Sequence, residues 1–597
     1  MMTYFLPISL ILVYSTTIAI ISKKRIEQTI PVGLVLIVLI VYLFGIFDNL
    51  KLGITAVEIL AVIQMLVIAY MVCKQKDNAI IKEKIKKIIT PGLVVYLCLC
   101  AMAIWSNQSR MFENHDEFTH WGKIVKNMFR YNTYGTNAES AITFNEYPPF
   151  TATFQYIFVA IKNEFSETIP ITAQCILYFS IIIPITQNVK WDKSIKNLSV
   201  IIPILIFIPM IFYATFYIDI MTDGILGVMF GTCIFYACQK EEFKFKYTKI
   251  FTMLIMMTLT KTSGIGLAVL AISIITIKNI ITIKNSESKM ELKGIAIGVL
   301  LLAILTGVWY IKTNNATKTW DFTQYLKTEN TIPDESIGRK YIKAIFESQS
   351  ITEKRMTVFT MTLALICINM YLNKQTNYGN KTEQYYQTSM LVSIVIYLLF
   401  LYISYTKIFK PDEAETLSCF ERYASTILLA NAIFQMLKFV EIKKETNFKT
   451  GIVILTILAC MAPQYSIMEK YIHKEEYLKT SGEFRNEYTK IRLYKKFLKQ
   501  TDKVLYIIDS KYNIKYIMAM NNYELMPVQI KNVRGGTFYS DDEFKETIKD
   551  YDYVYIYKIK SKEAEQIKSN FENNLVLEDI LYQVKFDKNT VKLAPII

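Results

Sequence analysis

The chain has 597 residues, of which 52% are hydrophobic, with a mean hydropathy of +0.26 and a formal net charge of +15. These values exclude a soluble enzyme, a collagen-like fibre and a disordered regulator, because a soluble chain of this length needs more polar surface. The apolar residues fall in runs of roughly 17–22 residues, the length of a helix that crosses a bilayer. The sequence therefore predicts a polytopic α-helical membrane protein.

We predict about fourteen membrane-spanning helices. In chain order they cover approximately residues 3–22, 30–48, 53–73, 89–106, 169–188, 197–215, 223–239, 248–263, 264–282, 294–312, 355–373, 387–405, 419–440 and 450–465. This pattern divides the chain into an N-terminal group of helices in residues 1–88, a main membrane region in residues 89–465 and a polar tail in residues 466–597.

Lysine and arginine gather in alternate connections between the spans, beginning with Lys23, Lys24 and Arg25. Basic connections stay on the cytoplasmic side of a membrane, so the charge excess is mainly a signal of topology and predicts no nucleic-acid partner. With Lys23–Arg25 inside, the segments 107–168 and 313–354 and the tail all lie outside. The nine Cys residues lie in or beside the apolar runs and predict neither disulfides nor a zinc site. The richness in Ile, Lys and Asn fits a bacterial inner membrane.

The tail has the pattern of a small extracytoplasmic α/β domain. Residues 503–508 and 553–557 have the apolar and aromatic character of buried strands. Ser540 followed by Glu543 predicts a capping box that opens a helix. Residues 485–499 and 561–571 are expected to be helical as well.

The first large outer segment carries the most informative motif, Asp116-Glu117 between His115 and His120. A carboxylate close to the membrane surface is costly unless it has a partner or a role. It could act as a general base on an acceptor hydroxyl, or it could bind a divalent cation. A solvated loop without chemistry is the alternative.

Two further features lie on the same predicted face. Tyr147-Pro148-Pro149 precedes a short apolar stretch that is expected to lie along the membrane surface, although Pro-Pro is also a simple signal for a helix start. Asp219 and Asp223 fall between the sixth and seventh spans, where a helix cap is the alternative to a functional role.

Two cations complete the set of candidates. Lys261 interrupts a long apolar stretch at a predicted outer turn and would suit the phosphate of a lipid, unless it only extends toward the headgroups. Arg422 enters the thirteenth span and could bind a phosphate through two nitrogens, unless it pairs with Glu421 or Glu415.

Taken together, these residues resemble the GT-C superfamily of membrane glycosyltransferases, especially bacterial relatives of the protein O-mannosyltransferases and the lipid A aminoarabinose transferases. The resemblance rests on Asp116-Glu117, Tyr147-Pro148-Pro149, an acidic residue at Asp219 or Asp223, Lys261 before Ser263-Gly264, and Arg422-Tyr423. It covers residues 89–465, and three additional spans precede the usual first one.

The resemblance implies transfer of a sugar from a polyprenyl-phosphate carrier to a glycan, lipid or protein acceptor at the outer face of the membrane. It implies that Asp116 is the general base, with Glu117 as a supporting carboxylate, and that Lys261 and Arg422 bind the phosphate of the donor. The remaining candidates would bind substrate: His120, Trp121, Tyr147, Asp219, Asp223 and Tyr423. No metal is expected to be obligatory, although Mg²⁺ or Mn²⁺ is possible because some members of the superfamily need a divalent cation.

Three other functions fit parts of the pattern. A flippase or other transporter of lipid-linked sugars would place charges near the bilayer midplane and often contains repeats, which this sequence lacks. A polymerase or ligase of lipid-linked sugars would also use outer loops and cations, without the paired carboxylates. A non-catalytic scaffold would use the tail for binding.

Overall fold

The computed structural model describes residues 2–75, 77–136, 142–283, 286–314, 334–347, 356–375, 381–441, 465–530, 532–535, 540–587 and 590–596. The chain forms two compact units. The first consists of Met1–Arg110, Ile124–Ala138 and Thr143–Ile472, and the second is made mainly of Met111–Lys123 and His473–Ile597.

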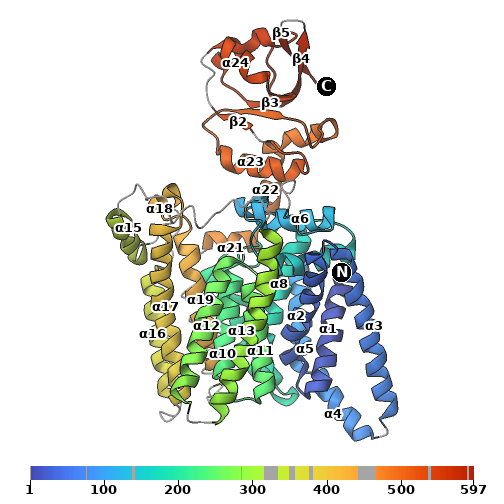
Figure 1. The fold of residues 1–597 in the computed structure, drawn as a ribbon, viewed down its shortest axis with the longest axis vertical. Coiled ribbons are helices and arrows are strands. Elements are labelled where there is room, and N and C mark those ends of the chain that lie inside the picture. Colours follow the sequence, from blue (N-terminus) through green and yellow to red (C-terminus); the bar gives the residue numbers. More distant parts are fainter. Residues whose placement is uncertain are drawn as a thin grey trace. The chain divides into compact units, whose positions relative to one another are not determined.

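The first unit is a bundle of apolar helices (Figure 1). Ten of its helices, among the residues described, are long and apolar enough to cross a membrane, so the chain is a polytopic helical membrane protein. These spans contain α1 (Met2–Ser22), α2 (Ile26–Ile46), α3 (Leu50–Lys74), α4 (Asn78–Ile88) with α5 (Pro91–Ser106), α8 (Thr168–Ile182) with η3 (Ile183–Thr186), η4 (Trp191–Lys193) with α9 (Ser194–Phe212), α12 (Thr262–Ile281), α13 (Ser286–Thr313), α17 (Lys381–Lys407) and α19 (Phe420–Glu441).

Three of the other predicted spans correspond to shorter helices. These are α10 (Asp223–Cys238), α11 (Phe243–Thr258) and α16 (Val358–Gln375). The predicted span 450–465 falls almost entirely outside the described residues, so the number fourteen stays a prediction. The shortness of α10 has a structural reason: it is buried along its length from Asp223 to Ala237, and a helix enclosed by other helices need not match the thickness of the bilayer.

Small residues allow α10 to lie directly against α19. A Cβ atom at Gly227 would overlap the carbonyl oxygen of Thr426, and one at Gly231 would overlap the carbonyl oxygen of Ala430. This spacing of two glycines, four residues apart on one face, is typical of close helix pairs in membranes. The backbone contact fixes the start of α10 beside the start of α19.

The short helix after the two prolines differs from its prediction. α7 (Phe150–Lys162) begins directly after Pro149, as a helix-start signal would require. Every residue from Phe150 to Val159 is buried, whereas a helix on a membrane surface would expose one face. The stretch therefore packs within the bundle, where its polar Gln155 donates a hydrogen bond to Gln174 Oε1 at 3.0 Å. The remaining helices of this part of the chain are α6 (Gly122–Tyr131), α15 (Asp334–Phe346), α18 (Pro411–Thr416) and α21 (Tyr465–Ile472).

The second unit contains a five-stranded sheet in the order β2-β1-β3-β4-β5. β1 (Val504–Ile508) pairs in parallel with β2 (Asn532–Gly535) and β3 (Tyr553–Lys558), whereas β4 (Ile580–Asp587) is antiparallel to both β3 and β5 (Thr590–Pro595). The helical elements are η1 (Glu117–Trp121), α22 (Lys474–Tyr488), η6 (Lys490–Phe497), α23 (Ile514–Leu525), α24 (Asp541–Ile548), α25 (Ser561–Ile567) and η7 (Lys568–Asn570).

The α/β character of the tail agrees with the sequence. Both predicted strands are present. The backbone N–H of Glu543 donates to Ser540 Oγ at 3.1 Å, so Ser540 caps the helix that follows it, as predicted. The predicted helix 485–499 is instead the end of α22 followed by the 3-10 turns of η6. The sequence did not predict the strands β2, β4 and β5. In β4 and β5, polar residues alternate with the apolar residues that pack on the core, so no continuous apolar run marks these strands.

Candidate functional site

Five of the predicted site residues come together in the first unit, and we refer to them as the Asp223 cluster: Asp223, Lys261, Arg422, Tyr147 and Tyr423. Lys261 Nζ lies 2.9 Å from Asp223 Oδ1, and Arg422 Nε lies 3.3 Å from Asp223 Oδ2. Lys261 Nζ also lies 5.9 Å from the ring centroid of Tyr147 and 5.3 Å from that of Tyr423. Two cations thus share one carboxylate between aromatic rings.

Asp223 is the first residue of α10, and Thr222 precedes it as the N-cap. A carboxylate in the first turn of a helix is stabilised by the helix dipole, which favours the cap interpretation of this residue. The same carboxylate nevertheless contacts both cations, and only 5% of its side chain is exposed. Asp223 therefore serves as the shared counter-ion of the cluster.

Lys261 lies at the turn between α11 and α12. The turn is tight, since a Cβ atom at Gly264 would overlap the carbonyl oxygen of Met257. The backbone N–H of Phe150 donates to the carbonyl of Leu259 at 2.6 Å, which ties the Tyr147-Pro148-Pro149 segment to this turn. With 11% of its side chain exposed and its ammonium bound to Asp223, Lys261 does not simply extend toward the headgroups.

Arg422 lies in the first turn of α19, directly after an irregular segment. Leu417 and Cys419 have φ values of 48° and 61°, a left-handed backbone that non-glycine residues adopt uncommonly. The Tyr213 hydroxyl donates to the carbonyl of Arg422 at 2.6 Å and fixes the helix start. The Arg422 guanidinium lies 5.2 Å from the ring of Tyr423 and donates to its hydroxyl at 3.3 Å.

Asp219 lies in the connection between α9 and α10, beside the cluster. Its carboxylate accepts a hydrogen bond from the Thr215 hydroxyl at 2.6 Å and one from the backbone N–H of Met221 at 3.1 Å. Burial raises the pKa of Asp219 to about 6, although these hydrogen bonds and the charge of Arg422 act in the opposite direction. Burial thus favours the protonated form of Asp219.

The other predicted site residues belong to the second unit. Asp116 is partly exposed, and its Oδ1 lies 3.5 Å from His115 Nδ1. Glu117 is buried, and its Oε2 accepts hydrogen bonds from the backbone N–H groups of Glu113 and Asn114, both at 2.8 Å. Of the two adjacent carboxylates, Glu117 therefore closes the local turn.

His120 and Trp121 form part of the interior of η1. Both are buried, and their rings meet edge to face with centroids 4.4 Å apart. In this structure they pack within the second unit, as core residues do.

The chemistry open to the Asp223 cluster is anion binding. Lys261 and Arg422 are two cations that share the carboxylate of Asp223, with Asp219 as a second carboxyl group near Arg422, and both cations stand at helix N-termini. Helix N-termini carry a partial positive charge, which adds to the potential of the side chains. Among the residues described, no group of three or more His, Cys, Asp and Glu could hold a metal ion.

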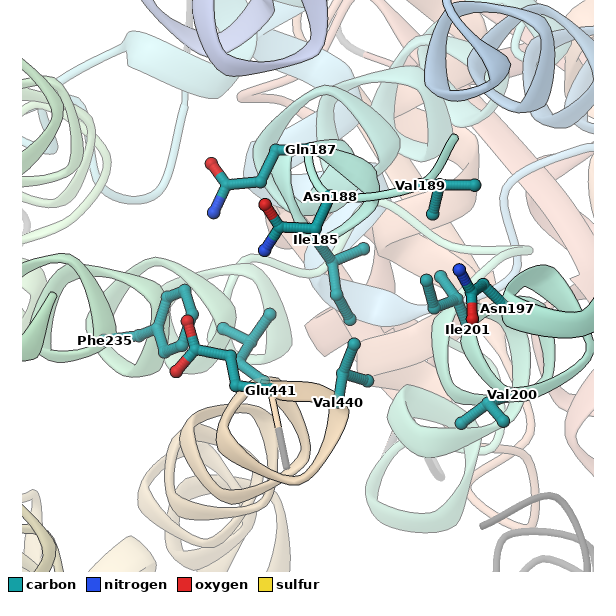
Figure 2. A pocket seen from close by; sticks show the side chains of 11 residues that line it. Ile185, Gln187, Asn188, Val189, Asn197, Val200, Ile201, Phe235, Val440 and Glu441 are labelled. Carbon is teal, nitrogen blue, oxygen red and sulfur yellow. The ribbon is translucent and has the colours of Figure 1, made fainter. Parts of the chain in front are cut away.

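A cavity of about 120 Å³ lies at the opposite end of the bundle, where α10 and α19 end (Figure 2). Its polar lining consists of Gln187, Asn188, Asn197 and Glu441, and apolar residues such as Phe235 complete the wall. The sequence did not indicate this cavity, because its residues come from four separate elements and form no local motif.

Sequence reasoning missed Tyr213, which lies beside the cluster. Its hydroxyl donates to the carbonyl of Arg422 at 2.6 Å and so holds the start of α19. The abundance of tyrosine, 40 in the chain, was the only available signal, and it does not single out positions.

Comparison of the sequence with protein-family models and with curated proteins finds no match.

Proposed function

We propose that this chain is a GT-C-type glycosyltransferase that moves a sugar from a polyprenyl-phosphate carrier to a cell-envelope acceptor at the outer face of a bacterial cytoplasmic membrane. The observation that carries the proposal is the Asp223 cluster, in which Lys261 and Arg422 meet at the ends of apolar helices. A phosphate joined to a long apolar chain is a ligand that such a site suits, because its charge meets the cations while its chain stays in the apolar phase.

The proposed reaction is a displacement at the anomeric carbon. An acceptor hydroxyl attacks that carbon, the bond between carbon and phosphate oxygen breaks, and the hydroxyl proton passes to Asp116. Negative charge then grows on the leaving polyprenyl phosphate, where Lys261 and Arg422 stabilise it. The rings of Tyr147 and Tyr423 restrict the orientation of the Lys261 ammonium.

Between the two adjacent carboxylates, the contacts favour Asp116 as the base. Glu117 is buried, and its carboxylate already accepts two backbone hydrogen bonds. The Asp116 side chain is 32% exposed, so it can meet an acceptor.

We propose no obligatory metal. Asp223 is held by two cations, and a divalent cation placed there would be repelled by both.

The test compares cells that carry the native chain with cells that carry Asp116→Asn or Lys261→Met, using mass spectrometry of surface glycans and polyprenyl-linked sugars. We expect each variant to lose one glycan substituent and to accumulate its lipid-linked donor, with turnover lowered by about a hundredfold or more. The accumulated compound would identify the sugar.

Lys438→Met is the matched control. The side chains of Lys438 and Lys261 are each 11% exposed and paired with carboxylates. Lys438, however, lies in the last turn of α19, whereas Lys261 lies at the start of α12. The control should keep the native glycans. If Asp116→Asn and Lys261→Met also keep them at normal protein levels, the proposal is contradicted. Donor that accumulates only on the cytoplasmic face would favour a flippase instead.

A further inference from the structure

The segment Met111–Lys123, which carries Asp116, folds as part of the same compact unit as the C-terminal domain. Glu113 is its main polar anchor. The Glu113 carboxylate accepts hydrogen bonds from the hydroxyls of Tyr477 and Ser481, both on α22, the latter at 3.1 Å. The hydroxyl of Tyr516, on α23, donates to the Glu113 backbone carbonyl at 2.6 Å. Three hydroxyls from two helices thus hold a single residue of the segment.

An aromatic contact lies beside this anchor. Phe118 is 1% exposed, and its ring centroid lies 6.0 Å from that of Tyr516 and 5.5 Å from that of Tyr523. Phe112 meets Tyr523 as well, at 5.9 Å. Edge-to-face pairs of buried rings contribute beyond their apolar area, so the segment shares a core with α23.

Arg485 extends this contact. Its guanidinium lies 5.2 Å from the ring of Phe118 and 5.6 Å from that of Tyr523, and one of its nitrogens lies 2.7 Å from Glu524 Oε1. The arginine links α22, α23 and the segment through contacts that are largely shielded from water.

The local backbone leaves Asp116 little freedom. Asp116 stands directly before η1, a single π-helical turn of a kind that is rare and concentrated at functional sites. Glu117 closes the turn in front of it through the two backbone hydrogen bonds. At the far side of η1, a Cβ atom at Gly122 would overlap the ring of Phe112, so the two ends of the segment pack on each other.

We propose that α22 and α23 of the C-terminal domain position Asp116, with Tyr477, Ser481, Tyr516 and Arg485 as positioning residues that act through Glu113 and Phe118. This inference rests on the proposed function, because it takes Asp116 as the base. A base that is displaced by about 1 Å can lose on the order of a hundredfold in rate, so anchors at both ends of the short segment would matter for turnover.

The experiment uses the full-length protein in lipid nanodiscs and the double variant Tyr477→Phe/Tyr516→Phe. This variant removes two hydroxyl anchors of Glu113 and keeps both rings. Tyr582→Phe is the matched control, since its hydroxyl bonds to the backbone of Leu577 within the same domain and does not contact the segment.

Two readouts separate positioning from folding. We expect amide hydrogen exchange in residues 111–123 to rise about tenfold in the double variant, with the strands of the sheet and the control unchanged. We also expect turnover of the polyprenyl-linked sugar that accumulates in Lys261→Met cells to fall about tenfold, with KM for this donor unchanged.

Unchanged exchange in residues 111–123, or faster exchange with full turnover, would overturn the inference. Full turnover by Asp116→Asn, measured in parallel, would instead remove the base from the proposed function. The exchange result does not depend on that outcome, so the two failures are distinguishable.

Discussion

The two ends of the helical bundle both bury lysines and carboxylates, yet they do so in different settings. At the far end from the Asp223 cluster, Glu241 contacts Lys24 and Lys249, and Glu291 contacts Lys246 and Lys278. As in the Asp223 cluster, two cations share one carboxylate. The number of cations per carboxylate therefore does not distinguish a candidate binding site from ion pairs that only stabilise the fold.

On α12 and α19, the cations at the two ends of the bundle differ in their position relative to the helix dipole. Lys278 and Lys438 lie in the last turns of α12 and α19, where a cation is stabilised. Lys261 and Arg422 lie at the starts of the same two helices, where a cation is disfavoured. At the far end, Lys246 and Lys249 also lie in the first two turns of a helix, α11, and Lys249 Nζ lies 4.4 Å from the ring centroid of Tyr236, so the contrast holds for α12 and α19 and not for every cation. A cation at the start of a helix, where the dipole disfavours it, is the arrangement that we expect where an anion binds.

Removal of the shared carboxylate at each end is the most direct test of whether the two ends differ in anion binding. Asp223→Asn and Glu241→Gln each leave buried cations without their shared partner and should lower the free energy of unfolding by about 3 kcal/mol. A short-chain prenyl phosphate should then raise the thermal unfolding midpoint of Asp223→Asn, by up to about 2.7 kcal/mol of stabilisation at a hundredfold excess over its Kd. It should leave Glu241→Gln unchanged. Equal shifts in both variants would show that the two ends do not differ in anion binding.

The second prediction concerns the helix pair that brings Asp223 to Arg422. Gly231→Ala places a methyl group against the carbonyl oxygen of Ala430, so α10 and α19 must move apart. We expect a loss of about 1–3 kcal/mol in the free energy of unfolding, measured by thermal denaturation, together with lower transfer. Gly266→Ala is the control, because no atom lies within 4 Å of the added Cβ and alanine favours a helix. A similar loss in both variants would exclude close packing as the cause.

The smallest expected effect is a pH dependence at Asp219. Its folded-state pKa of about 6 lies above the ordinary value of 3.8, so its protonated form stabilises the fold. This contribution is fully present below about pH 3.8 and is lost as the pH rises through about 6, with a slope of at most about 1.4 kcal/mol per pH unit. Asp219→Asn should remove this part of the pH dependence when the unfolding midpoint is measured across that range. An unaltered slope would mean that another group titrates there.

Local composition is enough to predict the class of the protein and most of its helices. Apolar runs of about 20 residues can satisfy their backbone only as spanning helices, so their positions follow from local composition. Ten of the predicted spans correspond to such helices among the residues described. The candidate residues were chosen for the same local reason: Asp223, Lys261 and Arg422 are charges at the edges of apolar runs, where charges are costly.

Which of these charges meet depends on how elements that are distant in the chain pack together. Asp223 and Arg422 are far apart in the chain and come together because Gly227 and Gly231 let two helix backbones touch. Likewise, no local pattern could indicate that the Asp116 segment shares a core with Tyr516 and its neighbours. Composition sets the cost of a buried charge, whereas the packing of distant elements decides which partner offsets that cost.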